Sequence, residues 1–594
     1  MPGISLLHGR NSVPTAELLD SVCFFDQYEK HTAVETGETV IGHTGYSDYP
    51  IHRFETDDAV ILLEGKLYDI DDPSMLVDSV QPPLTAGRAE ELGDWLHERD
   101  GDFLLVVYWK GTGNIDIFND CLSRLPTYYA TIDGTAVVSR ELKFIREFAL
   151  RTGSPVELDR VAAGQLLTFG YPLGDRLPFK GVRSIPPGSW VHIDEQITVS
   201  QLRQLDFSSR SSETRTVVEN AENLASRFRT ACRNRVEEDS PLLVSLSGGL
   251  DSRAVAATYD DIGVPFDFVT FSDSDDGLSE DARVARAIAD RLGSDWELYS
   301  TSSTDAHRSK LLEMKQGMNY LGMAFILDFF TQLRTEYSSG VYVTGDGGDK
   351  TLFDLTPSKN LSSDSELARY VVDENSRLSL RDAAAVADID AEKILDSVRQ
   401  RLQEYPEPSR KDKYVHFILR ERGINWLGHG EDRNRYFFWS TSPFYSAPFF
   451  DYAMSCPAEQ KGARKLYAAF LEEFSSELME LNYANFGAPV DSTRFWLKRT
   501  AYDLASRYPS LRDKILQLLE TDESHKRDVA QSIREKISDT NAGQLSKNAV
   551  SDISQQHGSH RLTPLLMLFT LVSLVEEQGP AQVSTPQQTV SRTQ

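Results

Sequence analysis

A glycine-rich turn between an apolar strand and a helix is the feature that most narrows the possible folds of this chain. Residues 242–246 form a short apolar run, which continues into Ser247-Gly248-Gly249-Leu250-Asp251-Ser252, and a helical pattern begins near Ser252. Glycine lets the backbone come close to a ligand, and free N–H groups at the start of a helix favour a pyrophosphate. No Gly-Lys-Ser/Thr follows, so this is not a Walker loop. We predict a nucleotide phosphate loop, formed by Leu246, Ser247, Gly248, Gly249 and Ser252.

A second turn of the same kind follows another apolar strand. Residues 341–344 lead into Gly345-Asp346-Gly347-Gly348-Asp349. In a parallel sheet both turns lie at the same carboxyl edge, so their acidic side chains face one crevice. We expect Asp251 and Asp349 to hold Mg²⁺, and Asp346 to act as an acid or base. Gly345 and Gly347 would contact the nucleotide. Either turn taken alone is also compatible with a structural Gly/Asp loop.

The pattern of apolar residues changes once along the chain. Residues 1–205 alternate in short strands separated by turns, which predicts a β-rich first domain. A small-polar run at 207–214 suits a linker, and from 214 onward strands alternate with helices, which predicts a parallel sheet. Beyond residue 361 the periodicity is mostly helical. We therefore predict domains at 1–205 and 214–577, followed by a disordered Gln/Ser/Thr/Pro-rich tail at 578–594.

The charge of the chain restricts its partners. The 594 residues carry a formal net charge of −28, which argues against binding to nucleic acid or to an anionic membrane surface. Because acidic residues recur in clusters, we hypothesise adaptation to a high-salt cytoplasm, where self-repulsion is screened. An ordinary acidic mesophilic protein is the alternative.

The spacing of the cysteines and the hydropathy of the sequence indicate the cellular compartment of the protein. Cys23, Cys121, Cys232 and Cys456 are far apart in sequence, so neither a zinc site nor a disulfide framework is indicated. The longest apolar stretch, 565–575, is too short to span a bilayer, and the first residues lack the pattern of a signal peptide. We expect a cytoplasmic protein.

Together the two glycine-rich turns resemble those of the asparagine synthetase B family, which carries an SGGxDS pyrophosphate loop and a later G-x-G-x-D turn. Val269-Thr270-Phe271-Ser272 looks like the family strand that meets adenine, so the resemblance implies that Thr270 and Phe271 contact ATP. Ala447-Pro448-Phe449-Phe450-Asp451 is similar to the family's V-P-F-L-D segment. The resemblance implies an α/β domain of the adenine-nucleotide α-hydrolase type with a helical C-terminal extension.

The first domain resembles the family's glutaminase, an α+β N-terminal-nucleophile fold that releases ammonia from glutamine. Leu63-Glu64-Gly65-Lys66 looks like its N-G-E strand turn, and Asp100-Gly101-Asp102-Phe103 looks like its D-G-x-F. The family's Met-Cys-Gly-Ile is Met1-Pro2-Gly3-Ile4 here, and proline has no thiol to act as nucleophile. Glu64 also replaces the Asn of the oxyanion hole, where its charge would repel a developing oxyanion. We expect no glutaminase activity.

The resemblance implies an AMP-forming carbon–nitrogen ligase that uses ATP and Mg²⁺. A carboxylate would attack the α-phosphate of ATP, and ammonia or an amine would capture the acyl-adenylate, as β-lactam synthetases do with an amine of their own substrate. Alternatives are a synthetase fed by a separate glutaminase and a silent nucleotide-binding scaffold, and a homodimer is possible. The family's late active-site Lys has no clear match, with Lys465 and Lys498 as the nearest candidates. Which carboxylate is bound stays open.

Overall fold

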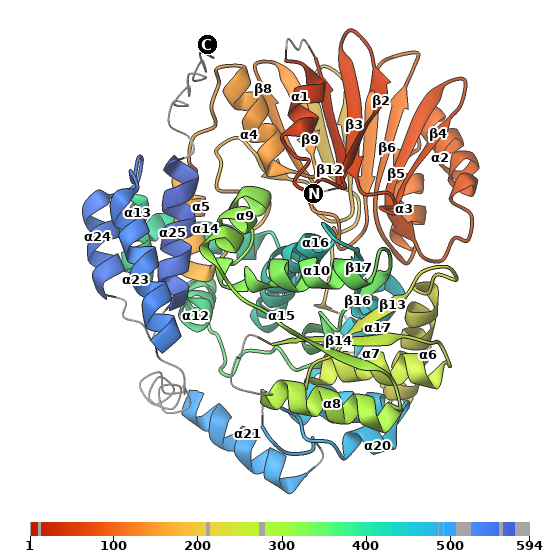
Figure 1. Cartoon of the computed structure of the whole chain (residues 1–594), viewed down its shortest axis with the longest axis vertical. Coiled ribbons are helices and arrows are strands. Elements are labelled where there is room, and N and C mark those ends of the chain that lie inside the picture. Colours follow the sequence, from red (N-terminus) through yellow and green to blue (C-terminus); the bar gives the residue numbers. More distant parts are fainter. Residues whose placement is uncertain are drawn as a thin grey trace, which may run out of the picture.

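The computed structural model describes residues 2–9, 13–208, 214–272, 279–484, 486–490, 492–506, 524–556 and 562–576. In Figure 1 the antiparallel strands of the N-terminal part lie above a smaller parallel sheet, and a group of helices lies to one side. The predicted tail at 578–594 and most of the predicted linker lie outside the described residues. In the part of the chain that is described, every helix is too short or too polar to cross a membrane.

Two six-stranded antiparallel sheets form the N-terminal part, in the strand orders β10-β8-β9-β1-β3-β2 and β12-β11-β7-β6-β5-β4. The strands are β1 (Gly3–His8), β2 (Glu29–Glu35), β3 (Thr39–Gly45), β4 (Ile51–Glu55), β5 (Ala59–Leu67), β6 (Gly101–Trp109), β7 (Ile115–Asn119), β8 (Tyr128–Ile132), β9 (Thr135–Ser139), β10 (Arg183–Ser184), β11 (Ser189–Ile193) and β12 (Ile197–Gln201). These strands confirm the β-rich first domain that the sequence predicts.

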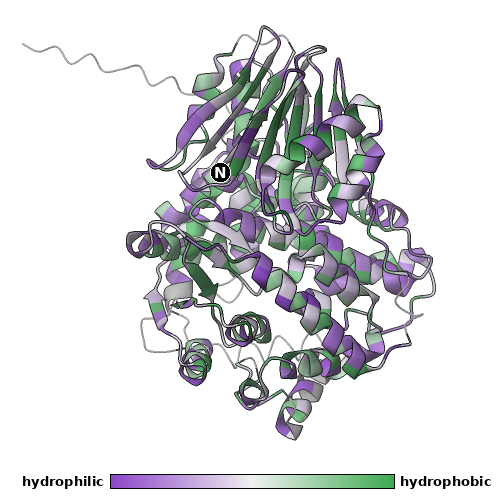
Figure 2. Ribbon diagram, turned by 90° about the vertical axis from the view of Figure 1, so that its right-hand side faces the viewer, coloured by the Kyte–Doolittle hydropathy of each residue, from purple (hydrophilic) through white to green (hydrophobic). Residues whose placement is uncertain are grey.

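Side chains alternate across β5, because successive residues of a strand point to opposite faces. Val60 and Leu62 pack in the core shared with the first sheet, whereas Ile61 and Leu63 pack in a separate cluster with α2 (Leu76–Thr85) and α3 (Ala89–His97). Helices α1 (Thr15–Asp20) and α4 (Leu142–Arg151) contact strands of the first sheet. Figure 2 shows the hydrophobic residues concentrated along the central strands. These layers agree with the expected N-terminal-nucleophile-like class.

A five-stranded parallel sheet organises the C-terminal part, in the order β15-β14-β13-β16-β17. Its strands are β13 (Leu242–Ser245), β14 (Asp267–Ser272), β15 (Trp296–Ser300), β16 (Val341–Val343) and β17 (Trp439–Thr441). Helix α6 (Val217–Asn234) precedes the first of these strands. The connections between the strands contain α7 (Leu250–Asp261), α8 (Glu280–Leu292), α9 (Asp305–Lys315), α10 (Phe325–Glu336) and α11 (Gly348–Leu352). Because β13 and β16 are parallel neighbours, the turns that follow them lie at the same edge, as the sequence predicted.

Most of the remaining chain is helical, as expected. Its longer helices are α12 (Asp364–Asn375), α13 (Leu380–Ala387), α14 (Ala391–Gln403), α15 (Arg410–Phe417), the π-helical segment η4 (Ile418–Leu427), α16 (Gly428–Asn434), α17 (Ala447–Ser455), α19 (Lys465–Glu472), α21 (Thr493–Ser506), α23 (Ser524–Asp539), α24 (Lys547–Gln556) and α25 (Leu562–Glu576).

Helix α5 (Arg160–Phe169) belongs to the first 205 residues in sequence but packs among C-terminal helices. It contacts α12, α13, α14 and α25 (Figure 1). A Cβ at Gly164 of α5 would lie 2.6 Å from Ile394 of α14, which shows how closely these helices approach. A helix from the first 205 residues therefore packs among helices of the C-terminal part of the chain.

Candidate nucleotide site

The turn after β13 is held in shape by its own hydroxyl groups. The Ser247 backbone N–H donates to the Ser252 Oγ at 3.1 Å, and the Ser252 hydroxyl donates to the Ser247 carbonyl at 3.1 Å. The Gly249 N–H donates to the Ser247 Oγ at 3.2 Å. Helix α7 begins at Leu250, so its N-terminal end faces the same turn. The turn is thus a rigid strand-to-helix junction at which the helix dipole favours an anion.

The Gly248 N–H already binds an anionic oxygen. It donates to the Asp281 Oδ1 at 2.9 Å, from the first turn of α8. Burial raises the pKa of Asp281, and the bond from Gly248 opposes that rise. A Cβ at Gly248 would lie 2.5 Å from the Cβ of Ala484, so only glycine fits here without displacement of a neighbour. This geometry agrees with a backbone donor that a phosphate oxygen could use.

Asp251 and Asp349, the two predicted metal ligands, meet between the turns. The Asp349 backbone N–H donates to the Asp251 Oδ2 at 3.1 Å, and the Tyr467 hydroxyl donates to the Asp251 Oδ1 at 2.7 Å. Burial raises the pKa of Asp251, and the negative charge of Asp349 raises it further. Asp349 forms an ion pair with its neighbour Lys350. A carboxylate whose pKa is raised by burial and by a neighbouring negative charge is stabilised by a cation.

The backbones of the two turns touch through glycine. A Cβ at Gly345 would lie 2.5 Å from the backbone N of Ser252, and a Cβ at Gly348 would lie 2.6 Å from the Asp251 carboxyl carbon. Gly347 has a φ of +99°, a left-handed conformation that favours glycine, and a Cβ there would lie 2.7 Å from the Tyr445 ring. The glycines of the second turn are therefore needed for its close approach to the first.

Asp346 lines a cavity of about 400 Å³. Its carbonyl accepts a hydrogen bond from the Ser442 hydroxyl at 2.6 Å, which ties the turn to the residue after β17. Burial raises the pKa of Asp346, while Arg124 and Arg433 oppose that rise. Arg124 belongs to the N-terminal part, so the two parts of the chain act together on this carboxyl group. A carboxyl group with a raised pKa suits proton transfer.

Thr270 and Phe271 lie on β14, next to the phosphate turn. The Thr270 hydroxyl donates to the Leu246 carbonyl at 2.7 Å and accepts from the Trp296 indole N–H at 2.9 Å. Thr270 is buried, so its side chain is engaged within the sheet. Phe271 packs against Phe325 and Phe329. Contact of Thr270 and Phe271 with adenine stays a prediction. Because the Thr270 side chain is engaged within the sheet, Thr270 would contact adenine through its backbone atoms.

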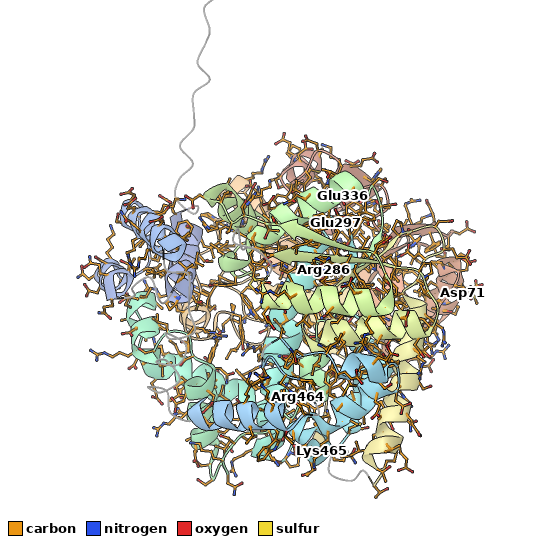
Figure 3. The ribbon with its side chains drawn as sticks, turned by 60° about the horizontal axis from the view of Figure 1, so that its bottom comes forward. Asp71, Arg286, Glu297, Glu336, Arg464 and Lys465 are labelled. Atoms are coloured by element: carbon orange, nitrogen blue, oxygen red, sulfur yellow. The ribbon has the colours of Figure 1, made fainter. Side chains whose placement is uncertain are left out.

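Two residues of the site escaped the sequence reasoning. Tyr467 bonds directly to Asp251, and Arg464 is buried beside the rings of Phe353 and Tyr483. Figure 3 shows Arg464 next to α21, with Lys465 nearby. Lys465 is exposed, as is Lys498, whose ammonium group donates to the Phe486 carbonyl at 2.7 Å. The periodicity of α19 marks Tyr467 as a core residue, and no motif distinguishes it further.

The pair Asp251 and Asp349 offers a magnesium ion two oxygen ligands. Among the described residues, groups of three or more His, Cys, Asp or Glu that could hold a metal are absent. Mg²⁺ commonly takes one or two carboxylates and completes its shell with water and substrate phosphates. The donor set therefore fits a magnesium ion that arrives with a nucleotide, and it does not fit a metal held by protein alone.

The position that the sequence resemblance assigns to a glutaminase site is filled by an ion pair. Glu64 is fully buried and accepts from the Ile4 N–H at 2.8 Å, from the Tyr49 hydroxyl at 2.7 Å and from the Arg140 Nε at 2.9 Å. A Cβ at Gly3 would lie 2.8 Å from the Glu64 Oε1. The space beside the first strand is thus occupied by side chains that pair with each other.

The same ion pair begins a network between the two parts of the chain. Four buried pairs cross the interface: Arg140–Asp432 at 2.6 Å, Arg124–Glu431 at 2.6 Å, Arg235–Asp100 at 2.9 Å and Arg435–Asp102 at 3.0 Å. Buried pairs that are broken on one side are costly, because an uncompensated charge remains. The network therefore fixes one orientation of the N-terminal sheets on the synthetase-like part.

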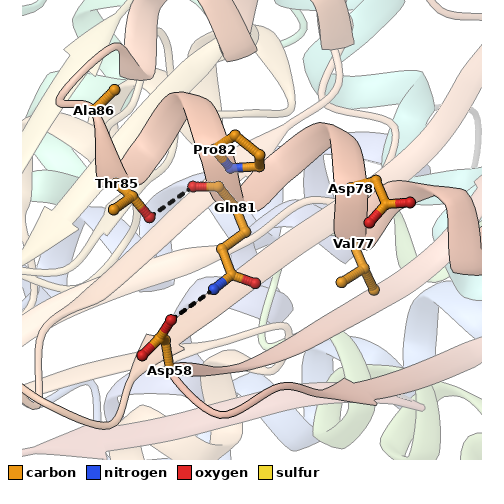
Figure 4. A pocket seen from close by; sticks show the side chains of 7 residues that line it. All are labelled: Asp58, Val77, Asp78, Gln81, Pro82, Thr85 and Ala86. Atoms are coloured by element: carbon orange, nitrogen blue, oxygen red, sulfur yellow. Dashed lines mark hydrogen bonds between the residues drawn. The ribbon is translucent and has the colours of Figure 1, made fainter.

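A further hollow lies on the N-terminal part, between α2 and the turn before β5 (Figure 4). Gln81 donates there to Asp58 at 3.1 Å, and Thr85 donates to the Gln81 carbonyl at 2.9 Å. The charged groups that line it are two aspartates, Asp58 and Asp78. Its lining offers no positive charge that would hold a phosphate or a carboxylate.

The chain is similar in sequence to a curated protein over more than half of its length. A curated relative, the amidase chyE of Penicillium rubens, is 24% identical over 380 residues, which cover 58% of this chain and 50% of the relative. The chain thus spans about half the length of this curated relative.

Two solved structures give TM-scores of 0.23, which say nothing about this fold. One is the glutamine phosphoribosylpyrophosphate amidotransferase of B. subtilis complexed with ADP and GMP, at 10% identity over 69% of this chain and 94% of that chain. The other is described as the allosteric regulatory enzyme of purine biosynthesis, at 9% identity over 63% of this chain and 78% of that chain.

The family model described as asparagine synthase matches residues 223–573, more than half of the chain, and includes both glycine-rich turns. The chain belongs to the asparagine synthase family.

Proposed function

We propose that this chain is an AMP-forming ligase that adenylates a carboxylate and transfers the acyl group to ammonia or an amine. Its family comprises ATP-dependent, amide-forming enzymes. The observation that carries the proposal is the hydrogen bond of 3.1 Å from the Asp349 N–H to the Asp251 carboxylate. It brings the backbone of the second turn onto the Asp251 carboxylate at the N-terminal end of α7, which supports binding of magnesium and a nucleotide between the two turns.

The chemistry follows from this arrangement. A substrate carboxylate oxygen attacks the α-phosphorus of ATP and pyrophosphate leaves, so the negative charge on the leaving group must be stabilised. Magnesium held by Asp251 and Asp349 would supply that stabilisation. The nitrogen nucleophile then attacks the acyl carbon and AMP leaves. Asp346, whose pKa is raised by burial, would accept the proton that the nucleophile loses.

The nitrogen donor in this proposal is not glutamine. Pro2 offers no thiol, and Glu64 holds the neighbouring space with Arg140, Tyr49 and Ile4. A tetrahedral oxyanion there would meet the Glu64 carboxylate instead of a donor. The N-terminal sheets would then serve to position residues such as Arg124 at the ligase site.

Pyrophosphate release tests the proposal. The purified full chain would be given ATP, Mg²⁺ and a panel of carboxylic acids, with ammonium or glutamine as the nitrogen source. We expect turnover with ammonium or with an amine-bearing substrate, and none that depends on glutamine. Turnover with glutamine alone would contradict the assignment of the N-terminal part. Binding of ATP with no pyrophosphate released from any acid would favour a nucleotide-binding scaffold.

A further inference from the structure

The cavity beside Asp346 lies between the two parts of the chain. It is bordered by η4 and α16 on one side and by the ends of α5 and α25 on the other. Its volume of about 400 Å³ is within the range of roughly 300–1,000 Å³ in which small molecules bind. Asp346 connects it to the nucleotide site, because the same turn carries Asp349. A molecule in this cavity would lie next to the proposed reaction.

The lining carries more positive than negative charge. Arg377, Arg422 and Arg433 border the cavity, with Asp346 as the acidic residue. Among the described residues, Arg422 and Arg433 have no carboxylate within ion-pair distance. The four arginines of the buried interface network, by contrast, are each paired. Arg433 is buried, whereas Arg422 is half-buried. Burying a charge without an ion-pair partner is costly, so an anion from outside the protein fits best at Arg433.

Two buried polar atoms of the lining also lack partners. In the described part of the chain, neither the Arg433 Nε nor the Asn319 Oδ1 has a hydrogen-bond partner. Both residues are only 6% exposed. Buried donors and acceptors are normally satisfied, and one left alone costs about 1–3 kcal/mol. A ligand with an anionic oxygen and a donor group would satisfy both atoms.

The positive charges are spread along the cavity. Arg422 belongs to η4 and Arg433 to α16, eleven residues later on one helical run, which separates them by roughly 15 Å along its axis. Arg433 is near Asp346 and helps to oppose the rise in the pKa of that residue. Arg377 and Arg422 instead act on Tyr171, where their charges oppose the rise in pKa that burial causes. The cavity therefore offers one cationic group at the reaction end and two at the far end.

An aromatic wall joins the two ends. The rings of Tyr171 and Trp426 are stacked with centroids 5.5 Å apart, and Met323 and Met567 complete the apolar lining. Trp426 and Arg422 both belong to η4, whose ten residues are π-helical. Segments of π-helix are rare and frequently occur at functional sites. The wall suits a flat or apolar body between two anionic groups.

We propose that this cavity binds the carboxylate substrate, and that the substrate is a dianion with an aromatic or apolar body. Its reacting carboxylate lies at the Arg433 and Asp346 end, toward the nucleotide. Its second anionic group lies against Arg422 and Arg377. The inference rests on the proposed function for the identity of the reaction, and binding itself can be measured without ATP.

Calorimetric titration of the full chain without ATP tests the cavity. The probes are N-benzoyl-L-glutamate, with two carboxylates and a ring, hippurate, with one carboxylate and the same ring, and glutarate, with two carboxylates and no ring. We expect N-benzoyl-L-glutamate to bind at least about ten-fold more tightly than either of the others. Equal binding of the three probes, or no binding of N-benzoyl-L-glutamate, would overturn the proposal.

Two substitutions of Arg422 test whether this residue binds the second anionic group of the ligand. Arg422→Gln should remove the preference for N-benzoyl-L-glutamate over hippurate, and Arg422→Lys should keep part of it. Arg410→Gln is the matched control, because Arg410 is a half-buried arginine on the same helical run, outside the cavity, and pairs with Asp364. Thermal unfolding of each variant checks that it folds. An unchanged preference in Arg422→Gln would refute the assignment.

The experiments distinguish failure of the proposed ligase function from failure of the proposed substrate cavity. If N-benzoyl-L-glutamate binds as expected but no acid of the panel causes pyrophosphate release, the cavity stands and the ligase function falls. If an acid is turned over with the same KM in the wild type and in Arg422→Gln, the ligase function stands and the cavity assignment falls.

Discussion

Replacement of Gly345 by alanine should separate the two turns that form the nucleotide site. The added Cβ would lie 2.5 Å from the backbone N of Ser252, against an ordinary contact of at least 3.4 Å, so the turns must move apart by about 0.9 Å. The conflict is with backbone atoms and cannot be relieved by a side-chain rotation. Overpacking of this kind costs about 1–3 kcal/mol, and a misplacement of about 1 Å at a reacting centre costs roughly 100-fold in rate.

Two measurements check this prediction. Calorimetry of MgATP binding should show a dissociation constant raised about 5- to 150-fold, which corresponds to about 1–3 kcal/mol. Pyrophosphate release, with the best acid of the panel, should fall by about 100-fold. Gly111→Ala is the matched control, because a Cβ at Gly111 meets none of the described atoms within 4 Å. If Gly345→Ala binds MgATP and turns over like Gly111→Ala, the close contact of the turns is not needed and the reasoning is refuted.

Three further outcomes follow. Asp346→Asn should lower turnover by about 10²- to 10⁴-fold while MgATP binding is retained, because it removes only proton transfer, and unchanged turnover would reject that role. The double variant Pro2→Cys, Glu64→Asn should release no glutamate from glutamine, because Tyr49 and Arg140 still fill the space beside the first strand; release of glutamate would show that the two substitutions alone account for the loss. Thermal unfolding in low and high potassium chloride should show a higher midpoint in high salt, because a net charge of −28 repels itself, and an unchanged midpoint would remove the high-salt hypothesis.

The sequence was informative where a short segment determines its own geometry. The strand, turn and helix at 242–252 and the turn at 345–349 were both predicted, and parallel pairing of β13 with β16 brings them together. The contact between Asp251 and Asp349 could be predicted because the carboxyl ends of neighbouring parallel strands meet at one edge.

Features that depend on packing between distant segments were not predicted. The position of α5 among the C-terminal helices depends on contacts more than 200 residues apart in sequence, such as that of Gly164 with Ile394. The bond from Tyr467 to Asp251 is of the same kind. Glu64 was recognised as a poor oxyanion partner, but its pairing with Arg140 required the structure.

A double-mutant cycle on the metal site tests the central claim most directly. Manganese bound together with ATP would be counted by electron paramagnetic resonance in the wild type, Asp251→Asn, Asp349→Asn and the double variant, with Asp260→Asn, an exposed aspartate of α7, as the control. If one ion is held by both carboxylates, each single variant loses most of the ATP-dependent affinity and the double variant loses little more. Independent, additive losses, or an affinity that neither substitution changes, would contradict a shared metal–nucleotide site.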